Sequence, residues 1–228
     1  MAPQDTLFAR LRGACAGEWR AYVEHPFVAG LADGTLPQAC FRHYLVQDYL
    51  FLIHFARAYA LAAYKADTLD DIRQATEGLK AIVDVEMGLH VTFCAGWGLD
   101  EAAMAAAPEA DATMAYTRYV LEKGLAGDLL DLHVALAPCI VGYGEIGARL
   151  AADPATRTDG NPYAAWIEMY ASAEYQEVAA AEVAHLDRLM ARRGGPGRLD
   201  GLVTTFRQAT RLEAAFWDMG MSAPAPGR

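Results

Sequence analysis

The most reactive group in this sequence lies in the segment LAPCIVGYGEIG, at residues 136–147. Its thiol, on Cys139, precedes the ring of Tyr143 by four residues and the carboxylate of Glu145 by six. Residues four apart lie on the same face of a helix, so the thiol and the phenol should point into one volume. A thiol becomes a nucleophile when a base or a positive charge favours its thiolate form. Glycines on both sides of the tyrosine would let either a substrate or a neighbouring helix approach the backbone.

Two carboxylates elsewhere in the chain could serve the same site. Asp48 lies in HYLVQDYLFLIHF, where apolar residues surround it at helical spacing, so its side chain should be buried. A buried carboxylate needs a partner, either an Arg or Lys of another helix or the amino group of a ligand. Phe51, three residues further on, could cover a flat ring. Glu213 is either a buried acid or one half of a surface ion pair with Arg207 or Arg211.

Aromatic side chains recur along the chain and could line a pocket that stacks a planar heterocycle. Most tyrosines of helical proteins are part of the core, so no single ring distinguishes a pocket from a core. The candidates are Tyr116, Tyr143, Tyr163, Trp166 and Tyr170.

The remaining cysteines lack the combination of a tyrosine four residues later and glycines beside that tyrosine. A cysteine on an apolar helix is more often an inert small hydrophobe, which is our interpretation of Cys15, Cys40 and Cys94. No two of the four cysteines are close enough in sequence to form a CxxC pair. We therefore expect free thiols and no structural zinc.

A metal centre is the alternative that the spacing leaves open. Glu86 with His90, and Glu182 with His185, each place a carboxylate and an imidazole on one helical face. The second pair has the Glu-x-x-His spacing of di-iron bundles, which would indicate an oxidase that uses oxygen. However, Glu182 falls in EYQEVAAAEVAHLDRLMARR, a charged segment that is typical of a solvated face.

Composition limits the classes of partner. The chain has 228 residues, of which 54% are hydrophobic and 21% charged, so disorder is not expected. A net charge of −10 and the lack of a basic patch argue against nucleic acid and anionic membranes, and so against regulation by direct DNA binding. No apolar run reaches the roughly 18 residues needed to span a bilayer. No secretory signal is visible, and we expect a cytoplasmic protein.

Apolar residues recur at helical spacing, alanine is abundant and β-branched residues are sparse, so nearly the whole chain should be helical. We expect a single all-α domain over residues 1–221 and a flexible tail over 222–228. Helices that are apolar on several sides indicate a bundle with either an enclosed cavity or a large oligomer interface. The expected helices cover residues 5–17, 26–34, 35–65, 68–97, 108–121, 128–152, 163–171, 173–193 and 198–221.

Six segments in combination resemble the TenA family. They are HPF, DGTLP, FRHYLVQDYLFL, PCIVGYGEIG, NPYAAWIEMYAS and LEAAFWDM. They follow the family's order and approximate spacing over essentially the whole chain. The resemblance implies a haem-oxygenase-like helical fold that binds no haem, an enzyme without a cofactor, and a homotetramer.

The resemblance also implies an activity, that of a thiaminase II or aminopyrimidine aminohydrolase. Such an enzyme cleaves the C–N bond at the pyrimidine methylene of thiamine or of 4-amino-5-aminomethyl-2-methylpyrimidine. The product, 4-amino-5-hydroxymethyl-2-methylpyrimidine, enters thiamine salvage. The family has a branch with an active-site cysteine, and Cys139 places this sequence there.

The family's roles then fall on residues of this chain. Cys139 would be the nucleophile that adds to the pyrimidine ring, and Glu213 the acid/base. Asp48 would hold the amino group and an adjacent ring nitrogen. The resemblance also implies four aromatic pocket residues. Phe51 and Tyr143 would sandwich the ring, and Tyr116 and Tyr170 would add hydroxyl groups. Glu145 receives no role.

Overall fold

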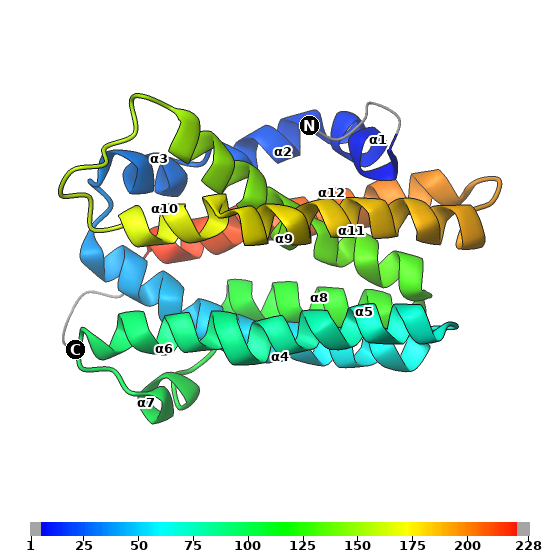
Figure 1. Ribbon diagram of the computed structural model, residues 1–228, viewed down its shortest axis with the longest axis horizontal. Coiled ribbons are helices and arrows are strands. Elements are labelled where there is room, and N and C mark those ends of the chain that lie inside the picture. Colours follow the sequence, from blue (N-terminus) through cyan, green and yellow to red (C-terminus); the bar gives the residue numbers. More distant parts are fainter. Residues whose placement is uncertain (1–5, 223–228) are drawn as a thin grey trace. The chain divides into compact units, whose positions relative to one another are not determined.

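The computed structural model describes the backbone of residues 6–222, and all side chains in that range except those at positions 85 and 89 (Figure 1). Within this range the chain is helical with no β-strand, which confirms the all-α prediction. The chain forms two compact units. Unit 1 holds described residues 6–37 and 133–217, and unit 2 holds 38–132 and 218–222. The prediction of one domain over 1–221 stays a prediction, and residues 223–228 of the expected tail lie outside the described residues.

Unit 1 begins with three short helices, α1 (Leu7–Ala14), α2 (Ala16–Val23) and α3 (Pro26–Asp33). The hydroxyl of Thr6 caps α1 by accepting from the backbone N–H of Ala9. Residue 5, with which the predicted helix begins, lies outside the described residues. The predicted helix over 5–17 is therefore wrong in one respect, because the chain turns at Cys15 and starts a second helix.

The remainder of unit 1 contains the long helices that carry the predicted thiol and acid. The long ones are α9 (Leu129–Ala152), α11 (Ala173–Arg193) and α12 (Arg198–Met221), and the short α10 (Ala164–Ala171) lies before α11 in the chain. The first four residues of α9 and the last four of α12 belong to unit 2. Within the unit, α11 packs against α1 and α10, and α10 also contacts α3. Ser172 is the single residue between α10 and α11, and its hydroxyl caps the N-terminus of α11. By length and composition α9 could cross a membrane, but most of its residues are buried in the protein.

Unit 2 is built on the 28-residue helix α4 (Gln38–Lys65). Figure 1 shows α5 running beside it, and α6, α7 and α8 also pack against α4. This explains why apolar and aromatic residues occupy several faces of α4. The other helices are α5 (Leu69–Lys80), the π-helical turn η1 (Ala81–Glu86), α6 (Met87–Ala95), α7 (Glu101–Ala105) and α8 (Asp111–Ala126).

Candidate active site

Cys139 differs from the other cysteines in its exposure. Three of the four thiols are buried, whereas that of Cys139 is partly exposed. Burial raises the pKa of Cys15 and of Cys94, which keeps both as neutral thiols. Because α9 is helical through this segment, Cys139 and Tyr143 lie one turn apart on one face, as predicted. Partial exposure is therefore the property that distinguishes this thiol among the four cysteines.

The helix around the thiol is supported by α2. Tyr22 donates from its hydroxyl to the carbonyl oxygen of Pro138 at 3.3 Å. Its ring lies against Gly142, so the small residue there accommodates a neighbouring helix and not a substrate. Pro138, directly before Cys139, has no backbone N–H to donate within α9, so the helix lacks one hydrogen bond there.

A cluster of aromatic rings surrounds the predicted stacking residue, Tyr143. Its ring centroid lies 4.8 Å from that of Tyr170 and 5.3 Å from that of Trp217. Trp166 completes the cluster, at 4.6 Å from Tyr170. The structure therefore brings two predicted pocket residues, Tyr143 and Tyr170, into contact. Trp217 was not predicted as part of the site, since nothing in its local sequence separates it from ordinary core.

Glu213 is a buried acid. Only 2% of the residue is exposed. Arg207 and Arg211, the candidates for a surface ion pair, instead approach Glu18 on α2 at 3.3 and 3.5 Å. Glu213 lies one helical turn before Trp217, which contacts Tyr143. The surface-pair interpretation of Glu213 is thus wrong, and this carboxylate of α12 is a buried acid.

Asp48 is also buried, with 4% exposure, but its partners are not the Arg or Lys that the sequence suggested. Tyr44, one turn earlier on α4, donates to its Oδ2 at 3.1 Å. The imidazole Nε2 of His90, on α6, lies 2.6 Å from the same oxygen. Tyr44 could be anticipated from its spacing to Asp48, but no sequence signal joins His90 to a residue 42 positions away.

The predicted ring-binding residues of unit 2 also come together. The ring centroids of Phe51, on α4, and Tyr116, on α8, lie 5.0 Å apart at 40°. The ring of Phe55, one turn later on α4, stacks on that of Phe51, with 5.2 Å between the ring centroids. Because Asp48 and Phe51 are three residues apart on one helix, the carboxylate and this aromatic pair belong to adjoining faces of α4.

The seven predicted site residues therefore fall into two groups. One group lies in unit 1 and the other in unit 2. The first contains the thiol, the acid and two tyrosines whose rings are in contact, and the second contains a hydrogen-bonded carboxylate with two rings. Their members are Cys139, Tyr143, Tyr170 and Glu213 in unit 1, and Asp48, Phe51 and Tyr116 in unit 2.

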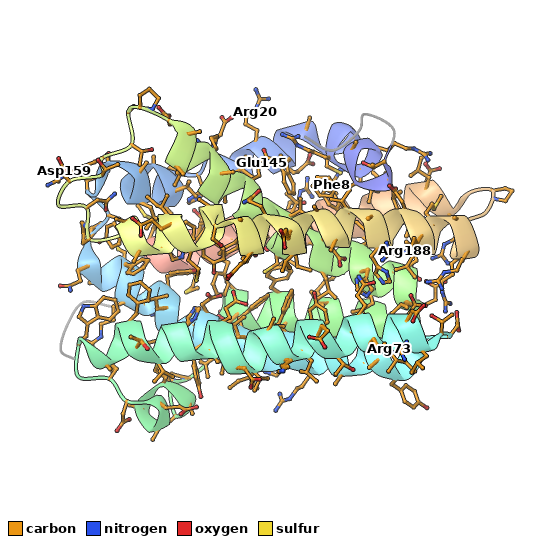
Figure 2. All side chains as sticks on the ribbon, viewed as in Figure 1. Phe8, Arg20, Arg73, Glu145, Asp159 and Arg188 are labelled. Atoms are coloured by element: carbon orange, nitrogen blue, oxygen red, sulfur yellow. The ribbon has the colours of Figure 1, made fainter. Side chains whose placement is uncertain are left out.

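The residues of the metal alternative have other partners. Across the described residues, no group of three or more His, Cys, Asp or Glu side chains is arranged to hold a metal ion. Glu182 is 4% exposed, so its assignment to a solvated face is wrong. Its Oε1 accepts from Nδ1 of His133 at 2.8 Å. Nδ1 of His185 faces the guanidinium of Arg188, labelled in Figure 2, at 3.2 Å. His90 uses both ring nitrogens, as its Nδ1 lies 2.8 Å from a backbone carbonyl oxygen.

Glu145, which follows Tyr143 in the thiol segment, has a structural role. It is labelled in Figure 2, and it forms an ion pair with Arg12 at 2.8 Å. It also accepts from the indole N–H of Trp19 at 3.2 Å. These contacts tie α9 to α1 and α2, which agrees with the absence of a predicted catalytic role.

The chain is similar to known proteins over most of its length. An aminopyrimidine aminohydrolase of Halalkalibacterium halodurans is 38% identical over 201 residues, which cover 88% of this chain and 89% of that protein. The crystal structure of a TenA family transcription regulator from Silicibacter sp. TM1040 matches with a TM-score of 0.91 at 44% identity, over 96% of this chain and 98% of that one.

The fold prediction is confirmed by a more distant structure. A domain with a heme oxygenase-like fold from Shewanella denitrificans matches with a TM-score of 0.70 at 17% identity, over 92% of this chain and 90% of that one. A model of one family covers residues 14–223, which is nearly the whole sequence. The chain belongs to the TENA/THI-4/PQQC family.

Proposed function

We propose that this chain is a hydrolase of thiamine salvage, an aminopyrimidine aminohydrolase of the thiaminase II type. It cleaves the C–N bond at the pyrimidine methylene of thiamine or of 4-amino-5-aminomethyl-2-methylpyrimidine, and releases 4-amino-5-hydroxymethyl-2-methylpyrimidine. The relative of that name, similar over most of both chains, supports the reaction class. The observation that carries the proposal is the partly exposed thiol of Cys139, one turn from Tyr143, in a chain whose other thiols are buried.

In the proposed mechanism the thiolate of Cys139 adds to a carbon of the pyrimidine ring. Glu213 takes the thiol proton and delivers a proton to the ring nitrogen that receives the electron pair. The addition ends the aromaticity of the ring. The electron-rich ring then expels the substituent on the methylene as ammonia or a thiazole. Water adds to the methylene carbon, and the thiolate leaves as aromaticity returns. Covalent catalysis thereby replaces one difficult displacement with easier steps.

Recognition of the pyrimidine is assigned to the remaining predicted residues. The carboxylate of Asp48 accepts from the exocyclic amino group. Phe51 and Tyr143 cover the faces of the ring, since flat heterocycles stack well on aromatic side chains. Tyr116 and Tyr170 add hydroxyl groups. Ring contacts of Phe51 with Tyr116, and of Tyr143 with Tyr170, support these assignments by fixing the orientation of each ring.

A turnover assay with both substrates tests this function. Purified protein should release ammonia from 4-amino-5-aminomethyl-2-methylpyrimidine, or the thiazole from thiamine, with the hydroxymethylpyrimidine as the common product. The ratio of the two rates identifies the preferred leaving group. A protein that turns over neither compound, although folded, would refute the proposal.

The assembly and location are also proposed and not established. We propose a cytoplasmic homotetramer. Large apolar side chains at the end of α4 and nearby support self-association, because Tyr64 is 86% exposed and Leu125 is 67% exposed. Lys65, next to Tyr64, donates to the carbonyl oxygen of Leu125 at 3.3 Å. Tyr64 and Leu125 therefore belong to the same area of unit 2. Sedimentation that finds only monomer contradicts the tetramer.

The net charge of −10 does not favour the direct regulation of transcription that the name of the Silicibacter protein suggests. Nucleic acid binding draws most of its affinity from cationic side chains on phosphates. A catalytic role is therefore the better conclusion for this chain.

A further inference from the structure

His90 is a buried histidine whose two ring nitrogens both face oxygen atoms. The residue is 2% exposed. Its Nδ1 lies 2.8 Å from the backbone carbonyl oxygen of Glu86, and its Nε2 lies 2.6 Å from Oδ2 of Asp48. Both contacts lie within unit 2. No catalytic or binding role in the proposed reaction has so far been assigned to this histidine.

The hydrogen bonds determine the charge of this pair. A carbonyl oxygen can only accept, so Nδ1 of His90 must carry a proton. The oxygen Oδ2 of Asp48 already accepts from the hydroxyl of Tyr44 at 3.1 Å. We infer a second proton on Nε2, which makes the ring an imidazolium that donates to a carboxylate, because a contact as short as 2.6 Å favours a charge-assisted bond. The pKa of His90 agrees: burial lowers it, but the hydrogen bond to Asp48 and the charges of Asp48 and Glu86 raise it to a net value above the ordinary one.

The same contacts determine which carboxylate oxygen serves a ligand. Among the described residues, the hydrogen bonds from Tyr44 and His90 both end on Oδ2 of Asp48. The other oxygen, Oδ1, is the one left to accept from a substrate. An ionised carboxylate has no proton to donate, so Oδ1 can pair with an N–H group but not with a carbonyl oxygen or an unprotonated ring nitrogen. As an anion, Asp48 therefore binds the amino group and not the adjacent ring nitrogen that the resemblance also assigns to it.

We propose that His90 is a positioning residue that holds Asp48 as an anion, and that this charge state selects 4-aminopyrimidines over their 4-oxo analogues. The inference rests on the proposed function and deepens it. An amino group donates to Oδ1, whereas an oxo group there would place two acceptors in contact. A site that discriminates by a buried hydrogen bond rejects the wrong partner strongly, because the unpaired group stays desolvated.

Loss of the imidazolium should reverse this selection. A buried carboxylate without a counter-charge takes up a proton to avoid the cost of desolvation. The resulting carboxylic acid can donate to an oxo group. The variant His90→Gln keeps a neutral donor near Nε2, whereas His90→Leu removes donor and charge together. Selectivity should therefore fall in the order wild type, His90→Gln, His90→Leu.

The first test uses the unmodified full-length protein. Nitrogen-15 NMR at pH 7 should show both ring nitrogens of His90 protonated, with the resonances assigned by their loss in His90→Gln. A neutral ring, with one nitrogen lacking a proton at this pH, overturns the proposal. Since this readout needs no ligand and no turnover, it stands apart from the proposed function.

The second test measures selectivity by calorimetry. The dissociation constants of 4-amino-5-hydroxymethyl-2-methylpyrimidine and its 4-oxo analogue are compared for wild type, His90→Gln and His90→Leu. The preference for the amino compound should fall at least about tenfold in His90→Leu, the range expected for a hydrogen bond to a charged group. His133→Gln is the matched control, because His133 and Glu182 form an equally buried pair with 3% and 5% side-chain exposure.

The outcomes separate a positioning role from a structural one. Under the proposal, His133→Gln loses thermal stability but keeps the wild-type preference for the amino compound. If both His90 variants keep that preference while they remain folded, the proposal fails although the proposed function stands. If the wild type binds neither pyrimidine, the proposed function and the selectivity fail together. If His90→Leu does not fold, the preference for the amino compound is compared between wild type and His90→Gln. An unchanged preference in His90→Gln then refutes the proposal.

Discussion

The ring of Tyr22 fills the space where a side chain at Gly142 would begin. A Cβ atom at Gly142 would lie 2.3 Å from Cε1 of Tyr22, far inside van der Waals contact. The same tyrosine donates to the carbonyl oxygen of Pro138. One residue of α2 therefore contacts the backbone of α9 both before and after Cys139.

We predict that Gly142→Ala destabilises the protein by about 1–3 kcal/mol, the usual cost of overpacking a buried site. Tyr22 is fully buried, so its ring cannot move aside without disturbing its neighbours. Chemical denaturation measures the change. Gly17→Ala is the control on α2, because a Cβ there meets no atom within 4 Å. In the control, alanine should stabilise the helix by about 0.5–1 kcal/mol. Equal effects in the two variants would contradict the close-packing argument.

The second prediction concerns the nucleophile. Cys139→Ala should abolish turnover of 4-amino-5-aminomethyl-2-methylpyrimidine, with a loss of at least about a thousandfold, as is usual when a nucleophile is removed. The fold should remain, since the side chain is partly exposed. Cys15→Ala is the matched control: its thiol is buried in the same unit and its pKa is raised by burial. If Cys139→Ala keeps the wild-type turnover rate, or if both variants lose activity equally, Cys139 is not the nucleophile.

Much of the helical architecture could be predicted because its signals are local. The bounds of α11 and α12 agree with the predicted ranges, since Ser172 caps one helix and the Gly-Gly-Pro-Gly turn separates the two. The predicted helix over 68–97 contains the π-helical turn η1, which inserts a residue without changing the apolar pattern. The five-residue helix α7 was not predicted, because so short a segment has no periodicity to detect.

Helical spacing alone could predict partners within the site only where one helix supplies both. Cys139 and Tyr143 are one turn apart, and so are Tyr44 and Asp48, so helical spacing relates each pair. The partner of a buried charge on another helix is set by tertiary packing. For that reason the sequence suggested an Arg or Lys for Asp48, where the structure has His90. Glu182 was misassigned for the same reason, because its charged segment also has a buried face.

The third prediction separates binding from chemistry at Asp48. Asp48→Asn should raise KM for the aminopyrimidine by about 10–100-fold, the range for a hydrogen bond to a charged group, with a smaller effect on kcat. The amide can still accept from Tyr44, so the local packing is retained. Steady-state kinetics measures both constants. Glu182→Gln, which alters an equally buried carboxylate paired with His133, should leave KM unchanged. An unchanged KM in Asp48→Asn would mean that Asp48 is only a structural ion pair.

The last prediction concerns the pH dependence of stability. The pKa of His90 is raised in the folded state, so the folded protein retains a proton that the unfolded chain releases near its ordinary value of 6.5. The groups that face His90 within unit 2 are Asp48 and Tyr44 on α4, and Glu86 on η1. The stabilisation is therefore complete below the unfolded pKa, and it is lost as the pH rises through the higher folded pKa.

Thermal unfolding of wild type and His90→Gln between pH 5.5 and 9 measures this effect. The wild type should exceed the variant by about 1.5–3 kcal/mol, or on the order of 5 °C in Tm, at the acidic end, and the difference should shrink as the pH rises. His43→Gln gives a control of opposite sign, because burial lowers the pKa of His43. There the wild type loses stability relative to the variant as the pH falls. A difference between wild type and His90→Gln that stays constant across this range would mean that His90 carries no proton to release, which contradicts its pairing with Asp48 as an imidazolium.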